Sequence, residues 1–227
     1  MSAQRINPVH LIADAAKRAM MDYLVMNELL RKTLEDFSQV EISSERKEVL
    51  KPLIEYVQGK VDNKEEVRLN FICTHNSRRS QLAQVWAQVS SIFFGLDTRC
   101  FSGGVEVTAF NERAVRSLIK SGFVVDHTEG SNPEYRLNYG GEHPIIAFSK
   151  EYDHPHNQGG KYAAVMTCTH ADENCPHIPD AEQRISVRYE DPKAYDDTPD
   201  EVMAYDSRSA QIGSEMFYVF SQISRNE

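Results

Sequence analysis

The stretch FICTHNSRRSQLAQVW, residues 71–86, constrains the fold of this chain more than any other. The apolar run VRLNFIC predicts a buried strand that ends at Cys73. A short polar loop with two adjacent arginines follows, and the pattern from Ser80 to about Phe94 predicts a helix. A strand that passes through a short loop into a helix is typical of strand–helix–strand units, so we expect an α/β domain.

The remaining sequence continues this alternation. Further strands are predicted at TRCFSGG (98–104), FVVDH (123–127), PIIAFS (144–149), KYAAVMTC (161–168) and, as a short extended piece, ISVRYE (185–190). Helices are predicted at about 108–121 and 198–224, and a loop at 150–160. Strands that alternate with helices predict a largely parallel sheet covered on both faces. We assign this domain to residues 67–227.

The preceding residues, 1–66, have a helical pattern. Apolar residues recur at roughly helical spacing from Leu11 to Phe37. Ser43 then supplies capping chemistry for a second helix, which we expect to stop near Gly59. We therefore predict an N-terminal helical hairpin over residues 1–66. It would pack on the main domain or on a second subunit, and the second arrangement would make the protein a homodimer.

Composition excludes several classes of protein. The 227 residues carry a formal net charge of −9, which argues against a nucleic-acid-binding protein because such proteins need a basic face. No apolar run approaches the roughly 20 residues that span a bilayer, and no secretory signal is recognisable. Four cysteines are too few for a disulfide scaffold. We expect a cytoplasmic protein with free thiols that binds neither nucleic acid nor membranes.

The residues Cys73 to Ser80 fit the pattern C-x5-R-S between a strand and a helix. Backbone N–H groups at a helix N-terminus can form an anion-binding nest. The expected oxyanion-binding residues are Thr74, His75, Asn76, Ser77, Arg78 and Arg79. The Arg79 side chain can hold an oxyanion with two donors, although Arg78 could simply be solvated. The positive field would favour the Cys73 thiolate as nucleophile, and Ser80 can donate a hydrogen bond to it. The alternative is a buried structural cysteine, which is the interpretation that we favour for Cys100.

A second pair of cysteines lies in MTCTHADENCPHIP. Cys168 ends a predicted strand, and Cys175 follows seven residues later. Zinc would accept Cys168, His170, Cys175 and His177 as ligands, but their spacing is neither C-x2-C nor H-x3-H. Two close thiols with a third elsewhere also suit a relay of thiol–disulfide exchange. A purely structural role is the third possibility.

The stretch FICTHNSRRSQLA resembles the phosphate-binding loop of the low-molecular-weight protein tyrosine phosphatase superfamily, and CTxNSxRS is closest to the form found in its thioredoxin-coupled arsenate reductases. The resemblance runs from about Val67 to the C-terminus and does not cover the N-terminal helical segment. It implies a three-layer α/β fold with a four-stranded parallel sheet. The arsenate reductases also carry a C-x6-C pair after a strand, as Cys168 and Cys175 do here. His75 departs from the family, where this position is usually glycine.

The resemblance also implies a mechanism. Cys73 would attack arsenate, Asp191 of the Asp-Pro step would be the general acid, and Cys168 and Cys175 would carry the resulting disulfide to a thioredoxin-like dithiol. No metal or bound cofactor is implied. The alternative enzyme is a tyrosine or small-molecule phosphatase, which needs only Cys73, Arg79 and Asp191. A non-enzymatic redox or anion sensor is a third class, against which the intact site residues argue.

Overall fold

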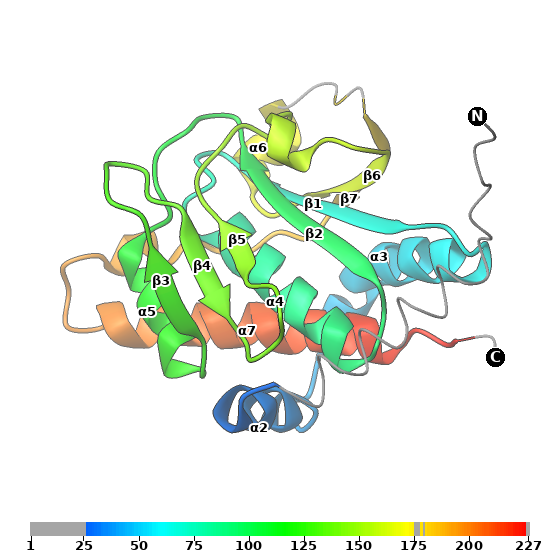
Figure 1. Cartoon of the computed structure of the whole chain (residues 1–227), viewed down its shortest axis with the longest axis horizontal. Helices are drawn as coiled ribbons and strands as arrows, with labels where there is room; N and C mark the ends of the chain where they lie inside the picture. Colours follow the sequence, from blue (N-terminus) through cyan, green and yellow to red (C-terminus); the bar gives the residue numbers. More distant parts are fainter. Residues whose placement is uncertain (1–25, 175–177, 179, 226–227) are drawn as a thin grey trace, which may run out of the picture.

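The computed structural model describes residues 26–174, 178 and 180–225 (Figure 1). The predicted relay residue Cys175 and the candidate ligand His177 lie outside this range, as do residues 1–25. The central sheet contains the strands β1 (Val67–Cys73), β2 (Thr98–Gly104), β6 (Tyr162–Met166) and β7 (Ala181–Ser186). Their order is β2-β1-β6-β7, and every pairing is parallel. The predicted α/β fold with a four-stranded parallel sheet is therefore confirmed.

Strand β1 lies inside the sheet, and all seven of its residues are buried. Phe71 is in register with Ser102 of β2 on one side and with Val165 of β6 on the other. A strand covered on both faces needs a continuous apolar run, which is the pattern that predicted it. Because β1 and β6 are parallel neighbours, the residues that follow their carboxyl ends emerge at the same edge of the sheet. That edge is where open α/β sheets place their sites.

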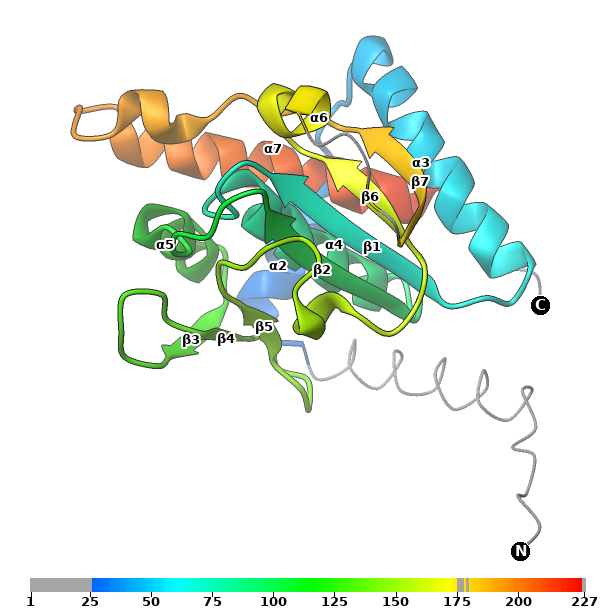
Figure 2. The same ribbon diagram turned by 90° about the horizontal axis from the view of Figure 1, so that it is seen from above.

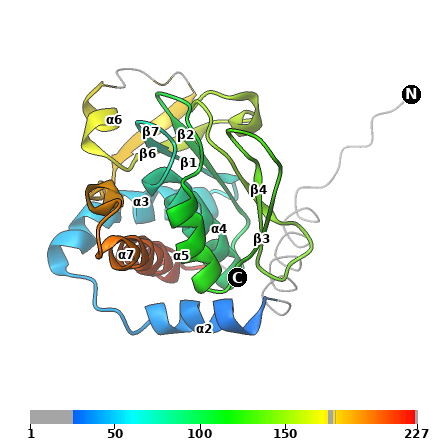
Figure 3. The same cartoon turned by 90° about the vertical axis from the view of Figure 1, so that its left-hand side faces the viewer.

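The long helices lie on one side of this sheet (Figure 3). They are α3 (Ser44–Asp62), α4 (Arg79–Phe93), α5 (Glu112–Lys120) and α7 (Glu201–Ser221). The short helix α6 (Thr169–Asn174) lies on the other side, as Figures 1 and 3 show. Helix α4 places Trp86 in the centre of the core, where its ring meets Phe37 and Phe123 edge-on at centroid distances of 5.1 and 5.5 Å. Helix α4 also packs against β1 and β2 of the sheet, and this fixes the loop from which it starts.

Three short strands form a second, antiparallel sheet: β3 (Val124–His127), β4 (Tyr135–Asn138) and β5 (Ile145–Ala147). The strands predicted at 123–127 and 144–149 thus exist, but they pair with β4 rather than with the parallel sheet. Strand β4 was not predicted. The extended piece predicted at 185–190 is also misplaced, since β7 covers Ala181–Ser186. Elements of three to six residues carry too little periodicity for their bounds to be predicted.

The N-terminal helix α2 (Glu28–Phe37) and α3 both pack against α7. The approach of α2 is close, because a Cβ at Gly213 of α7 would lie 2.5 Å from the Phe37 ring. The prediction that the second helix stops near Gly59 is wrong. The helix continues to Asp62, and Lys64 takes the left-handed conformation (φ 58°) that often follows a helix end. The division into a 1–66 hairpin and a 67–227 domain stays a prediction, and so does a homodimer through these helices.

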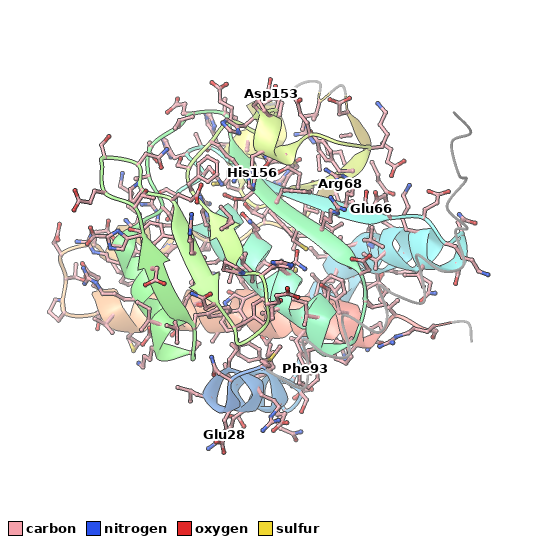
Figure 4. All side chains as sticks on the ribbon, viewed as in Figure 1. Glu28, Glu66, Arg68, Phe93, Asp153 and His156 are labelled. Atoms are coloured by element: carbon pink, nitrogen blue, oxygen red, sulfur yellow. The ribbon has the colours of Figure 1, made fainter. Side chains whose placement is uncertain are left out.

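The segment 150–160, predicted as a loop, contains the short 3₁₀ turn η1 (Pro155–Asn157) and an isolated bridge from Glu151 to Gly104 of β2. It is fastened to the sheet by the buried Arg68 of β1, which donates hydrogen bonds to the carbonyls of Asn157 (3.2 Å) and Gln158 (2.9 Å). Figure 4 shows Arg68 beside Glu66, its ion-pair partner at 3.3 Å, and Figure 2 shows the loop from above.

Among the helices of the described residues, none combines the length and the apolar character needed to cross a membrane.

Candidate active site

The loop between β1 and α4 turns its carbonyl groups outward. The carbonyl of His75 accepts hydrogen bonds from the hydroxyls of Thr108 and Ser149, both at 3.0 Å. The carbonyl of Asn76 accepts from Gln81 at 3.0 Å, and that of Ser77 accepts from the backbone of Asn111 at 2.9 Å. When the carbonyls of a short loop are held on the outside, its N–H groups face the inside. This is the arrangement of an anion nest.

The first turn of α4 is the floor of this nest. Asn27, Ser43 and Asn111 cap α2, α3 and α5 with their side chains, whereas no side chain caps α4. Its first N–H groups are therefore available to a ligand, and the helix dipole adds a partial positive charge there. The loop's sharp turn is made by Asn76, which has a φ of 45° and is fully buried.

Cys73 ends β1 at the base of the loop and is buried, with 3% of its surface exposed. Its Sγ lies 3.0 Å from Ser80 Oγ. The Asn76 side-chain amide donates to the same Ser80 oxygen at 2.9 Å, which leaves the Ser80 hydroxyl hydrogen for the sulfur. The Ser80 hydroxyl is thus placed to donate a hydrogen bond to the sulfur when it acts as a nucleophile.

Two arginines converge on Asp191. Arg79 Nη2 lies 2.8 Å from Asp191 Oδ2, and Arg78 Nε lies 2.8 Å from Asp191 Oδ1. The suggestion that Arg78 is solvated is thus wrong, because the side chain is buried against this carboxylate. Arg79 also donates to the Tyr189 carbonyl at 3.0 Å, and its Nε is buried with no partner among the described residues. An unpaired donor on the residue expected to hold an oxyanion is what such a ligand would satisfy.

The two arginines determine the protonation of Asp191. Partial burial would raise the pKa of this carboxyl, but the charges of Arg79 and Arg78 outweigh burial and hold the pKa below its usual value. Because the folded pKa is lowered, the two ion pairs stabilise the fold above the unfolded pKa of about 3.9. That stabilisation is lost as the pH falls through the folded pKa. Without a ligand, Asp191 is therefore ionised at neutral pH and cannot act as an acid.

We expect phosphate to raise the pKa of Asp191. The anion would draw Arg79 away from the carboxylate and add negative charge beside it, and both changes favour the protonated form. Carboxyl NMR titration, with the Asp191 signal assigned through Asp191→Asn, measures the effect. An Asp191 pKa that is the same with and without saturating phosphate would contradict its assignment as the general acid.

The His75 side chain lies outside the nest. Its Nε2 is 3.4 Å from Glu106 Oε2, and 43% of the side chain is exposed. Only the backbone of this residue belongs to the loop. A histidine can therefore occupy this position, because its imidazole lies beside Glu106 and outside the nest.

Cys168 follows β6 and is buried, with 2% of its surface exposed. It belongs to the same small buried cluster as Cys73, which also contains Ile72 and Met166. Thr74 of the nest bridges the two regions, since its Oγ1 lies 3.5 Å from Cys168 Sγ. Cys73 and Cys168 are thus brought to one edge of the sheet by neighbouring strands, although 95 positions separate them.

The surroundings of Cys100 differ from those of Cys73 and Cys168. Cys73, Cys100 and Cys168 are free within the described part of the chain. Cys100 lies on β2 among core residues, and burial raises the pKa of its thiol, in agreement with a structural role. The four-ligand zinc alternative includes Cys175 and His177, which lie outside the described residues.

Several curated proteins are similar to this chain. Arsenate reductase 2 of Staphylococcus haemolyticus is 27% identical over 123 residues, which are 54% of this chain and 76% of the relative. The arsenate reductase of Brevibacillus brevis is 29% identical over 124 residues, which cover 54% and 74%. The arsenate reductase of Bacillus cereus strain 03BB102 is 24% identical over 148 residues, 63% and 93% of the two chains. In sequence, this chain is thus similar to arsenate reductases.

No family model matches the chain. Among solved structures, a low-molecular-weight protein tyrosine phosphatase from T. tengcongensis is similar with a TM-score of 0.48, 18% identity and coverage of 69% of this chain and 99% of that one. An arsenate reductase from Archaeoglobus fulgidus has a TM-score of 0.45, 17% identity and coverage of 68% and 99%.

Sequence reasoning missed two features of the site. One is the ion pair of Arg78 with Asp191, beside that of Arg79. The available signal for it was the adjacent pair Arg78-Arg79. The other is the position of His170, whose Nδ1 lies 3.3 Å from Thr74 Oγ1. Nothing in the sequence indicates that contact, because it joins residues 96 positions apart.

Proposed function

We propose that this chain reduces arsenate to arsenite through a relay of three cysteines. The observation that carries the proposal is the position of Cys168, whose buried sulfur touches Thr74 of the nest that holds Cys73. A phosphatase would have no use for a second thiol at this place. The names of the curated relatives support the same reaction.

The first half-reaction uses the nest. Arsenate binds to the loop N–H groups and to Arg79, which leaves Asp191 free to take a proton. The Cys73 thiolate attacks arsenic, and Asp191 protonates the departing hydroxide, which leaves as water. The product is a Cys73–S–As(V) adduct, with no change in the oxidation state of arsenic.

The second half-reaction is the reduction. The Cys168 thiolate attacks Cys73 Sγ, and a disulfide forms between the two sulfurs as the S–As bond breaks. The electron pair of that bond stays on arsenic, which leaves as arsenite, As(III). Cys175 then attacks Cys168 and releases Cys73, and the Cys168–Cys175 disulfide is reduced by an external dithiol such as thioredoxin. The cycle needs no metal or bound cofactor and suits the reducing cytoplasm.

The second candidate is hydrolysis of phosphate monoesters. It needs only Cys73, Arg79 and Asp191, with water resolving the phosphocysteine. The half-exposed Tyr195, four residues after Asp191, could contact an aromatic substrate, since 48% of its surface is accessible. Phosphate and arsenate have the same shape and charge, so one nest could serve both reactions.

The test is a pair of assays on the wild type and Cys168→Ser. We expect the wild type to form arsenite from arsenate when thioredoxin, thioredoxin reductase and NADPH are present. Cys168→Ser should lose this activity but keep any hydrolysis of p-nitrophenyl phosphate, because the serine leaves the nest intact. A wild type that hydrolyses the ester but forms no arsenite would favour the phosphatase. A wild type inactive in both assays would favour a sensor.

A further inference from the structure

The hydroxyl of Thr74 lies between a buried thiol and an exposed imidazole. Its Oγ1 is 3.5 Å from Cys168 Sγ and 3.3 Å from His170 Nδ1. Cys168 is buried and His170, two residues later on α6, is exposed to solvent. The three groups form a continuous path from the thiol to the protein surface.

From this path we infer that His170 accepts the proton of Cys168 through the Thr74 hydroxyl and so activates the second nucleophile. The inference rests on the proposed function, in which Cys168 must become a thiolate to attack Cys73. His170 does not touch the reacting sulfur, so it is a positioning residue that acts through Thr74.

The hydrogen atoms balance along the path. Before reaction, the neutral imidazole carries its hydrogen on Nε2, the Thr74 hydroxyl donates to Nδ1, and the Cys168 S–H donates to Thr74 Oγ1. As the sulfur attacks Cys73, its proton moves to Thr74 Oγ1, and the original hydroxyl hydrogen moves to Nδ1. Thr74 is unchanged, and the imidazolium releases its proton to water because His170 is exposed.

A buried thiol needs such a path, because solvent cannot reach Cys168 to take up its proton directly. Among the described residues, Cys168 Sγ also accepts a hydrogen bond from the N–H of Ala171, at 3.4 Å, and this donor cannot take up a proton. Asp172 of α6 is bound by Arg184 and Arg188, and His75 of the loop lies beside Glu106. His170 is in contact with Thr74, and its imidazole is a group that can take up a proton.

The path also separates the proton transfers of the two half-reactions. Asp191 donates a proton when hydroxide leaves arsenic, and it lies against Arg78 and Arg79. His170 accepts a proton when Cys168 attacks, and it lies beyond Thr74 on the β6 side of the nest. Two groups can therefore be set for opposite tasks, one as an acid and one as a base.

The test measures the reactivity of Cys168 without arsenate. In Cys73→Ser/Cys100→Ser/Cys175→Ser, only the Cys168 thiol remains, and its rate of modification by the small reagent methyl methanethiosulfonate can be followed by mass spectrometry. Adding His170→Ala should slow this rate on the order of 10²-fold. The matched control is His143→Ala, which removes an exposed histidine of the β4–β5 connection and should leave the rate unchanged.

Two further variants separate proton acceptance from mere packing. Free imidazole should restore part of the rate in His170→Ala, since the position is open to solvent, and should not affect the parent. His170→Asn keeps a hydrogen-bonding group near Nδ1 but accepts no proton, so it should stay slow. Thr74→Val should slow the rate as much as His170→Ala, and the double variant should be no slower, because both lie on one path. Circular dichroism checks that each variant is folded.

Three results would overturn the inference: a parental rate in His170→Ala, full recovery in His170→Asn, or stoichiometric zinc in the wild-type protein that His170→Ala loses. The outcome is independent of the proposed function. If the rate depends on His170 but the wild type forms no arsenite, the relay to Cys168 stands and arsenate reduction fails. If arsenite forms and the modification rate is unchanged in His170→Ala, arsenate reduction stands and the inference about His170 is wrong.

Discussion

Cys73→Ser is expected to abolish both arsenite formation and hydrolysis of p-nitrophenyl phosphate, with a loss in kcat on the order of 10⁶. The reason is chemical. The hydroxyl of a serine at this position stays protonated at neutral pH, so the nest would hold an oxyanion with no nucleophile beneath it. Steady-state assays of both reactions measure the loss, and phosphate binding by calorimetry should persist because the loop N–H groups and Arg79 remain.

The control for this variant is Cys100→Ala. Cys100 is also a buried free cysteine, but it lies on β2 in a different buried cluster from that of Cys73. The activity of Cys100→Ala should match that of the wild type. If Cys73→Ser kept a substantial part of either activity, the nucleophile would have to be another residue.

Arg79→Lys is expected to lower kcat for either substrate on the order of 10²- to 10³-fold. Lysine keeps the positive charge but loses the planar set of donors that can hold two oxygens and contact the Tyr189 carbonyl at the same time. The effect should appear in kcat more than in KM, because the charge on the oxygens grows toward the transition state. Stopped-flow and steady-state kinetics separate the two parameters.

Arg116→Lys is the matched control for Arg79→Lys. Arg116 lies on α5 with 66% of its side chain exposed, and its partner is Glu112 at 3.5 Å on the same helix. Exposed pairs of this kind contribute little, so its kinetics should equal those of the wild type. Equal kinetics in Arg79→Lys would mean that charge alone holds the oxyanion.

The central part of the site could be predicted because its signals are local. The strand, the loop and the start of the helix between Val67 and Phe93 are contiguous, and their apolar pattern, cysteine and arginine all indicate the same structure. The parallel sheet followed from the alternation of strands and helices. The contact between Thr74 and Cys168 was not predictable in detail, since it depends on the register of β1 against β6.

The errors have equally physical causes. The three strands β3, β4 and β5 are three or four residues long. Their apolar pattern is therefore too short to indicate which sheet they join. Gly59 predicts a helix end, but the helix passes through it because the residues that follow continue the hydrogen bonding, as in the bond from Asn63 N to Gly59 O. The burial of Arg78 does not follow from its sequence neighbours, because it depends on a carboxylate 113 positions away.

The most direct test of the relay is a single turnover in Cys175→Ser. This variant retains Cys73 and Cys168 but cannot pass the disulfide onward. Incubated with excess arsenate, it should form one arsenite per chain and stop, and peptide mass spectrometry should find a disulfide between Cys73 and Cys168. Continued turnover with thioredoxin, or arsenite formed with both thiols still free, would contradict the account.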